Sequence, residues 1–387
     1  MSPLIFRIFI CVIVVLALVG IFSACDSVLR SDTEIITLAE PSEDLSSNFS
    51  PTATSTTDIT EITELETDST LTELTVDKSE GMNFEALCTY LKQYKALKVL
   101  NVNGIILTSD EYNTLCEMNP GVDIIATVTF ESLTLDLSAD EIDISNSVIT
   151  DNEAFKKLLA HFPSGLKLIM CDCGFTDAEM GALRKAYPHI SFVWRIYLGK
   201  WNIRTDDEAF SVMIYDDNYT RLTSEDLDVL KYCTNMYALD LGHQAITDLT
   251  VIGEMTDLRV LILADNKITD LTPLSNLKNL QYLELFVNRI SDLSPLAECT
   301  ELVDLNFGWN SVWDLSCIYS LPKIERLWLP TNPVSADKHS EISSVFPNAQ
   351  IVFEDVNSIS SGWRTHERYF SMRGMFTNNK YDVNFVK

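Results

Sequence analysis

The strongest pattern in the chain is an alternation of apolar and polar positions that returns every 22 residues from residue 237 onward. Each turn has two apolar positions separated by one residue, then an Asn or Gln three positions later, then another apolar position. The alternation predicts a short strand with one buried face, and the amide is expected to turn inward and satisfy backbone groups at the bend. The aligned turns start at Leu239, Leu261, Leu283, Leu305 and Leu327.

One such turn cannot bury its own apolar face, so successive turns must stack around a continuous core with a parallel sheet along one side. The pattern resembles the leucine-rich repeat, and the phrase from Ile268 to Leu274 is similar to the internalin type of Gram-positive bacteria. We therefore predict an α/β solenoid of leucine-rich repeats with a curved parallel β-sheet, regular over residues 231–357.

Residues 81–230 repeat the theme with longer, less regular turns, in which Ser147 and Cys173 take the Asn position. Residues 152–161 and 177–186 have helical spacing, and a proline follows each before the next apolar run. The N-terminal half is therefore expected to contain wider repeats with helices on the convex side. Residues 194–219 do not fit the register and are interpreted as an insertion or a junction between two solenoid halves.

The first 25 residues predict a signal peptide, because an uncharged run of about 15 residues is short for a membrane-spanning helix. Its ending, Phe22 to Cys25, resembles a bacterial lipobox, which implies lipidation of Cys25 and a folded part held on the extracellular face of the cell membrane. An uncleaved membrane anchor or an ordinary secretory signal is the alternative. Residues 26–80 are acidic, rich in Ser and Thr and poor in aromatics, so we expect a disordered stalk.

Charge and cysteine content restrict the function. A net charge of −28 disfavours nucleic acid, whose binding depends on Lys and Arg that neutralise phosphates. The seven cysteines after Cys25 are odd in number and unlike a disulfide framework, so we expect mostly buried thiols. Cys171 and Cys173 could be joined by His161 or His189 at a metal, but Cys173 already has a place in the repeat. We identify no catalytic, metal or cofactor motif, and we predict a protein that is not an enzyme.

Binding is expected on the exposed side of the sheet, where the residues between the core leucines form columns. Exposed aromatics and Arg are typical of interface hot spots. The predicted contacts to a host or bacterial surface protein are Tyr282, Glu284, Phe286, Asp304, Asn306, Trp309, Arg326 and Trp328. Trp313 has a different offset and is interpreted as structural.

Other interpretations of the same residues stay open. The rings could stack on a glycan, the solenoid could be only a spacer in the cell envelope, or the C-terminal residues could fold over the rings and bury them. Residues 358–387 are rich in aromatics and Arg and resemble tails that close some repeat proteins of Firmicutes. We expect them to cap the last open turn, since solenoids need end caps to stay soluble; a second recognition element is the alternative.

Overall fold

The computed structural model describes residues 70–78, 82–212, 220–357 and 362–386. The predicted signal peptide, Cys25 and most of the predicted stalk lie outside the described residues. Within these ranges no helix combines the length and hydropathy needed to cross a membrane.

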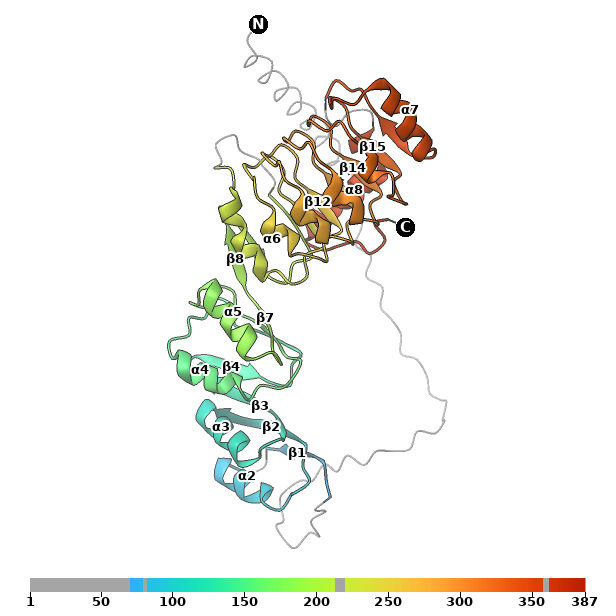
Figure 1. The fold of residues 1–387 in the computed structure, drawn as a ribbon. Helices are drawn as coiled ribbons and strands as arrows, with labels where there is room; N and C mark the ends of the chain where they lie inside the picture. Colours follow the sequence, from blue (N-terminus) through green and yellow to red (C-terminus); the bar gives the residue numbers. More distant parts are fainter. Residues whose placement is uncertain (1–69, 79–81, 213–219, 358–361, 387) are drawn as a thin grey trace, which may run out of the picture. The chain divides into compact units, whose positions relative to one another are not determined.

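The regular repeats form one parallel sheet of seven strands (Figure 1). The expected short strands are confirmed, with Leu239, Leu261, Leu283, Leu305 and Leu327 in direct register. Both faces of the central strands are buried, however, and not one face as expected. The sheet begins earlier than residue 231, because Phe210 pairs with Leu239. Its strands are β10 (Ala209–Ser211), β11 (Ala238–Asp240), β12 (Val260–Ile262), β13 (Tyr282–Glu284), β14 (Asp304–Asn306), β15 (Arg326–Trp328) and β16 (Gln350–Val352).

Short helical turns connect these strands. Four of the six turns start after an Asp whose carboxylate accepts from a residue two positions on, as Asp270 does from the Thr272 N–H at 2.8 Å and hydroxyl at 2.6 Å. Pro273, near the start of its turn, fits a position where no N–H is needed. The connections are η1 (Ser224–Tyr232), α6 (Thr250–Gly253), η2 (Thr272–Asn276), η3 (Ser294–Glu298), η4 (Ser316–Ile318) and α7 (Ala336–Val345).

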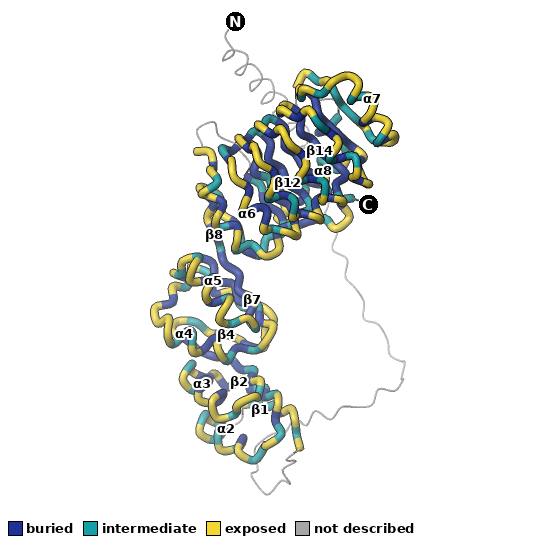
Figure 2. The backbone as a smooth tube through the Cα atoms, viewed as in Figure 1, coloured by how far each residue is buried: buried dark blue, intermediate teal, exposed yellow. Residues whose placement is uncertain are grey.

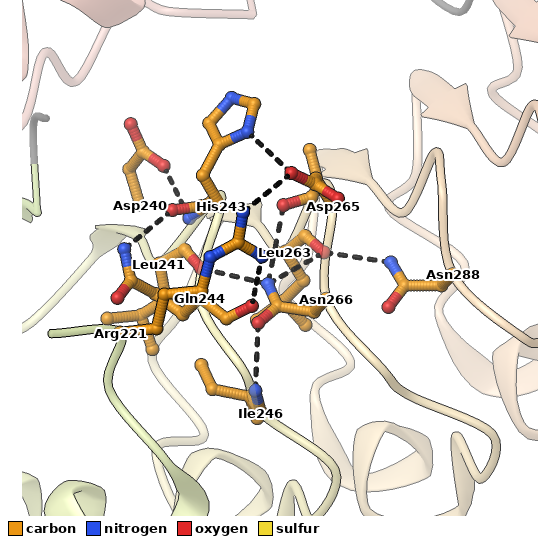
Figure 3. Close-up of polar contacts among 12 residues, drawn as sticks. Arg221, Asp240, Leu241, His243, Gln244, Ile246, Leu263, Asp265, Asn266 and Asn288 are labelled. Carbon is orange, nitrogen blue, oxygen red and sulfur yellow. Dashed lines mark hydrogen bonds and ion pairs between the residues drawn. The ribbon is translucent and has the colours of Figure 1, made fainter. Parts of the chain in front are cut away.

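The predicted inward amides are confirmed and form a ladder between coils. Asn266 donates to the carbonyls of Leu241 at 2.9 Å and Leu263 at 3.1 Å, and its oxygen accepts from the Ile246 N–H at 3.0 Å (Figure 3). Asn288 repeats the bond to the previous coil. The residue before each amide has a positive φ, which turns the backbone so that the side chain points inward; these residues are His243, Asp265, Val287, Trp309 and Thr331.

The N-terminal repeats are wider and carry helices, as predicted. Two helices begin at capping boxes, in which Thr108 and Thr176 bond to the residue three positions on. The helices are α2 (Phe84–Leu91), α3 (Ser109–Met118), α4 (Asn152–Leu159) and α5 (Asp177–Ala186). Their strands are β1 (Glu73–Asp77), β2 (Val99–Thr108), β3 (Asp123–Phe130) and β4 (Leu133–Asp136) in one sheet, and β5 (Glu141–Asp143), β6 (Lys167–Ile169) and β7 (Ser191–Val193) in another.

The structure corrects one predicted boundary and assigns one segment that the sequence left open. The stalk cannot extend to residue 80, because β1 pairs in parallel with β2 and buries Leu74 and Val76. The unassigned residues 194–219 contain an antiparallel hairpin of β8 (Arg195–Leu198) and β9 (Trp201–Arg204), followed by β10. This segment therefore supplies the first strand of the seven-stranded sheet as well as an inserted hairpin.

Candidate functional site

The outward-facing side of the seven-stranded sheet carries the predicted binding residues, and the predicted columns are confirmed by the register. Tyr282 stands beside Asp304 and Asp304 beside Arg326, while Glu284 stands beside Asn306. We call this side, which carries Asp240, Ile262, Glu284, Asn306 and Trp328 along its centre, the outer face.

The expectation that this face is exposed is wrong. Of the eight predicted contacts only Trp309 is exposed, at 42%. The chain's own residues 362–386, which we call the C-terminal segment, pack on this face, as one of the open alternatives allowed. The buried predicted contacts are Tyr282, Glu284, Phe286, Asp304, Asn306, Arg326 and Trp328.

The C-terminal segment consists of η5 (Trp363–Thr365), α8 (Glu367–Asn378) and the residues after them. Figure 1 shows α8 beside the strands of the sheet, and Figure 2 shows those strands as buried. The C-terminal residues were predicted to cap the last open turn. This prediction is wrong, because the segment packs along the outer face instead. It extends from Arg326 on β15, which donates to the Trp363 carbonyl at 3.2 Å, to Glu208 before β10, which accepts from the Tyr381 N–H at 3.1 Å.

Aromatic contacts hold both ends of the segment on the outer face. The Trp363 ring lies 5.1 Å from that of Trp328 and 5.4 Å from that of Tyr282, in tilted arrangements typical of aromatic pairs. Phe385 approaches Tyr282 edge-on at 6.0 Å. The remaining apolar contacts of the segment come from Met372, Met375, Phe376 and Tyr381.

A buried ion pair within the sheet also contacts the C-terminal segment. Arg326 donates two hydrogen bonds to the Asp304 carboxylate, from Nε at 2.9 Å and from Nη2 at 2.5 Å. Its guanidinium lies over the Trp363 ring, 4.5 Å from the ring centroid. Arg368 of α8 lies 3.0 Å from the same carboxylate and 2.7 Å from that of Glu325. A planar guanidinium suits this bidentate geometry.

Glu284 is a second buried acid of the site, 2% exposed. Its carboxylate accepts from the Trp363 indole N–H at 2.7 Å and from the Tyr282 hydroxyl. Burial raises the pKa of the Glu284 carboxyl, and the positive charge of Arg364 opposes that shift. The carboxylate is therefore a hydrogen-bond acceptor for the C-terminal segment.

One edge of the sheet stays open to solvent. We define the exposed edge by the five residues of positive φ and by Trp313, which is 65% exposed and not the packing residue that its offset indicated. His243 and Asp265 pair there at 3.0 Å, with Arg221 at 3.7 Å from the same carboxylate (Figure 3).

The cysteines have structural surroundings. Cys173 donates through Sγ to the Ile144 carbonyl at 3.1 Å, which confirms its predicted place at the Asn position. Burial raises its pKa to about 11, so the thiol stays protonated at neutral pH. The described part of the chain contains no group of three His, Cys, Asp or Glu side chains placed to hold a metal ion.

From sequence alone, coverage of this face by the C-terminal residues was kept as an alternative, but an exposed face was favoured. The available signal was charge complementarity, because Arg364, Arg368 and Arg373 follow Trp363 while acids recur on the central columns of the sheet. Arg373 lies 3.8 Å from Asp240 in the structure.

Comparisons with known proteins agree with the repeat. Residues 256–298 match the family model for leucine-rich repeats in two copies, so the chain contains leucine-rich repeats. No curated protein matches the sequence.

Solved structures with similar features include two internalins from Listeria monocytogenes and a leucine-rich-repeat protein from Leptospira interrogans. The first internalin is 20% identical, with 76% of this chain and 85% of that chain covered and a TM-score of 0.33. The second, internalin C2, is 29% identical over 39% of this chain and 76% of that chain, with a TM-score of 0.30. The Leptospira protein is 19% identical over 68% and 74%, with a TM-score of 0.34.

Proposed function

We propose that this leucine-rich-repeat chain is a recognition protein without enzymatic activity, held by a lipid on Cys25 at the extracellular face of a bacterial membrane, and that it binds a protein of a host or bacterial surface. The lipobox-like ending of the leader supports the location, and the repeats support binding, since stacked coils present long rows of side chains.

The observation that carries the binding proposal is the pair of exposed indoles on one coil, Trp309 and Trp313, at 42% and 65% exposure. Trp309 also has a φ of +58°, a region that costs a residue with a Cβ about 1–2 kcal/mol. Folding gains little from a large apolar ring in water, whereas Trp is among the residues most enriched in binding hot spots. With most of the outer face covered, the exposed edge is the part of the predicted site that a partner can reach directly.

The test is capture of proteins from host and bacterial surface extracts by the purified chain. We expect Trp309→Ala with Trp313→Ala to reduce capture at least about tenfold, the loss of roughly 1.4 kcal/mol of binding free energy. Phe370→Ala is the matched control, because Phe370 is a large exposed ring, at 62%, on α8 instead of the edge. Equal capture by the double variant and the control would refute binding at this edge.

Two further measurements separate the other parts of the proposal. A glycan array distinguishes a sugar ligand, on which the same rings could stack, from a protein. Mass spectrometry of the mature N-terminus tests Cys25, and an unmodified cysteine or an uncleaved leader would contradict lipid anchoring.

A further inference from the structure

The contacts of the outer face form a hydrophobic cluster of their own. The interior of the coils, which includes Leu239, Leu261 and Leu283, is one cluster. Tyr282, Phe286 and Trp328 belong to a different one, completed by side chains of the C-terminal segment. The coils therefore have their own core, and the segment packs on them as a separate layer.

The two surfaces that meet here are chemically complementary. The segment brings Trp363 and three arginines, and the face brings acids and rings. Two of the arginines pair with acids of the face: Arg368 lies 3.0 Å from Asp304, and Arg373 lies 3.8 Å from Asp240. The face therefore recognises both the positive charges and the indole of the segment that packs on it.

A cover that only shields apolar surface does not need buried charges, because the cost of desolvating an ion pair can exceed its attraction. Here Arg368 of the segment lies 3.0 Å from Asp304 of the face, and the two side chains are only 13% and 1% exposed. Charges arranged in this way select a partner of matching charge and fix its position. The outer face therefore has the chemistry of a binding surface, and the C-terminal segment occupies it.

We propose that the outer face is a binding site for a polypeptide segment that carries a tryptophan and arginines, and that the chain's own residues 362–386 occupy it as an intramolecular ligand. A partner segment of the same chemistry binds this face by displacing them. The inference deepens the proposed function by naming a second surface and its partner class, but it does not depend on the exposed edge.

Attachment to the same chain gives the C-terminal segment a high effective concentration at the face. An external segment therefore binds with an affinity reduced by the small fraction of molecules whose face is open. A substitution that weakens only the attached segment raises that fraction and leaves the site itself intact.

The experiment uses a fluorescent synthetic peptide of residues 362–386, titrated with the full chain and followed by anisotropy. We expect the Trp363→Ala chain, whose face keeps all its residues, to bind this peptide at least about tenfold more tightly than the unaltered chain does. The Phe370→Ala chain is the matched control and should bind like the unaltered chain. A scrambled peptide, and a peptide with Trp363→Ala and Arg368→Ala, should not bind.

The proposal is overturned if the Trp363→Ala chain, folded by circular dichroism, binds the peptide no more tightly than the unaltered chain, or if the scrambled peptide binds equally well. Should that chain not fold, Arg368→Gln, which removes two ion pairs but no ring, decides by the same criterion. No external partner takes part, so this result is separate from the outcome of the capture assay.

Discussion

Trp363 donates its indole N–H to the carboxylate of Glu284 over 2.7 Å, although 79 residues separate the two in the chain. Around this bond the C-terminal segment covers a sheet face whose residues would otherwise be exposed. The bond links the last part of the chain to the central strand of the repeats, and several predictions about stability depend on it.

Replacing Trp363 by Ala should loosen the C-terminal segment. The side chain is fully buried between Tyr282 and Trp328, and truncating a buried aromatic side chain costs about 3–5 kcal/mol. Limited proteolysis with mass spectrometry should show earlier cleavage within residues 362–386. Phe370→Ala should change the free energy of unfolding by no more than about 0.5 kcal/mol; equal protease resistance of both variants would count against the packing described.

Replacing Asp304 by Asn should destabilise the chain by about 3–5 kcal/mol, because it leaves a buried guanidinium without its opposite charge. Arg326 and Arg368 both contact this carboxylate. Urea denaturation measures the loss, with Asp257→Asn, at an exposed aspartate, as the control. A change as small as that of the control would show that the pair is not buried.

The stability difference between the Glu284→Gln variant and the unaltered chain should depend on pH. Burial raises the pKa of Glu284 above its ordinary value of 4.5. A carboxyl of raised pKa stabilises the fold below that ordinary value, and this contribution is lost as the pH rises through the folded-state pKa. Gln does not titrate, so the variant should gain stability relative to the unaltered chain as the pH rises above the ordinary value of 4.5.

This comparison isolates Glu284, because all other titrating groups are shared by the two chains. Urea denaturation at several pH values gives the difference in free energy of unfolding. A difference that stays constant over this range would mean that the Glu284 carboxyl titrates as it does in the unfolded chain.

Replacing Asn266 by Ala should cost roughly 3 kcal/mol, since each buried polar group left without a partner costs about 1–3 kcal/mol. The substitution removes the partner of the Ile246 N–H and of the Leu241 carbonyl, while the Leu263 carbonyl keeps its bond from Asn288. Thermal and urea unfolding measure the effect. Asn276→Ala is the matched control at an exposed asparagine, and similar values for both would contradict the ladder.

The repeat could be predicted from sequence because its signals are local and periodic. The 22-residue spacing put Leu261 beside Leu283 and Asp304 beside Arg326, as the register confirms. The inward amide at Asn266 follows from the position of Asn in the repeat, and the place of Cys173 follows from the same template in a longer repeat. Each depends only on the next coil, which the period itself supplies.

What could not be predicted depends on distant or weak signals. The alternation tells which side of a strand Tyr282 faces, but not that Trp363 covers that side. Seven predicted contacts were therefore misjudged as exposed, while Trp309 was placed correctly. The strand at Glu73–Asp77 was missed because its two apolar residues, Leu74 and Val76, end a long polar stretch that resembles a stalk.

The central claim, that the chain's own C-terminal segment lies on the outer face of the sheet, is tested most directly by hydrogen exchange of the tryptophan indole N–H groups, observed by NMR in the full chain. The account predicts that the Trp363 signal, whose group is buried and bonded to Glu284, persists far longer in D₂O than those of the exposed Trp309 and Trp313. Exchange of Trp363 as fast as that of Trp313 would contradict it.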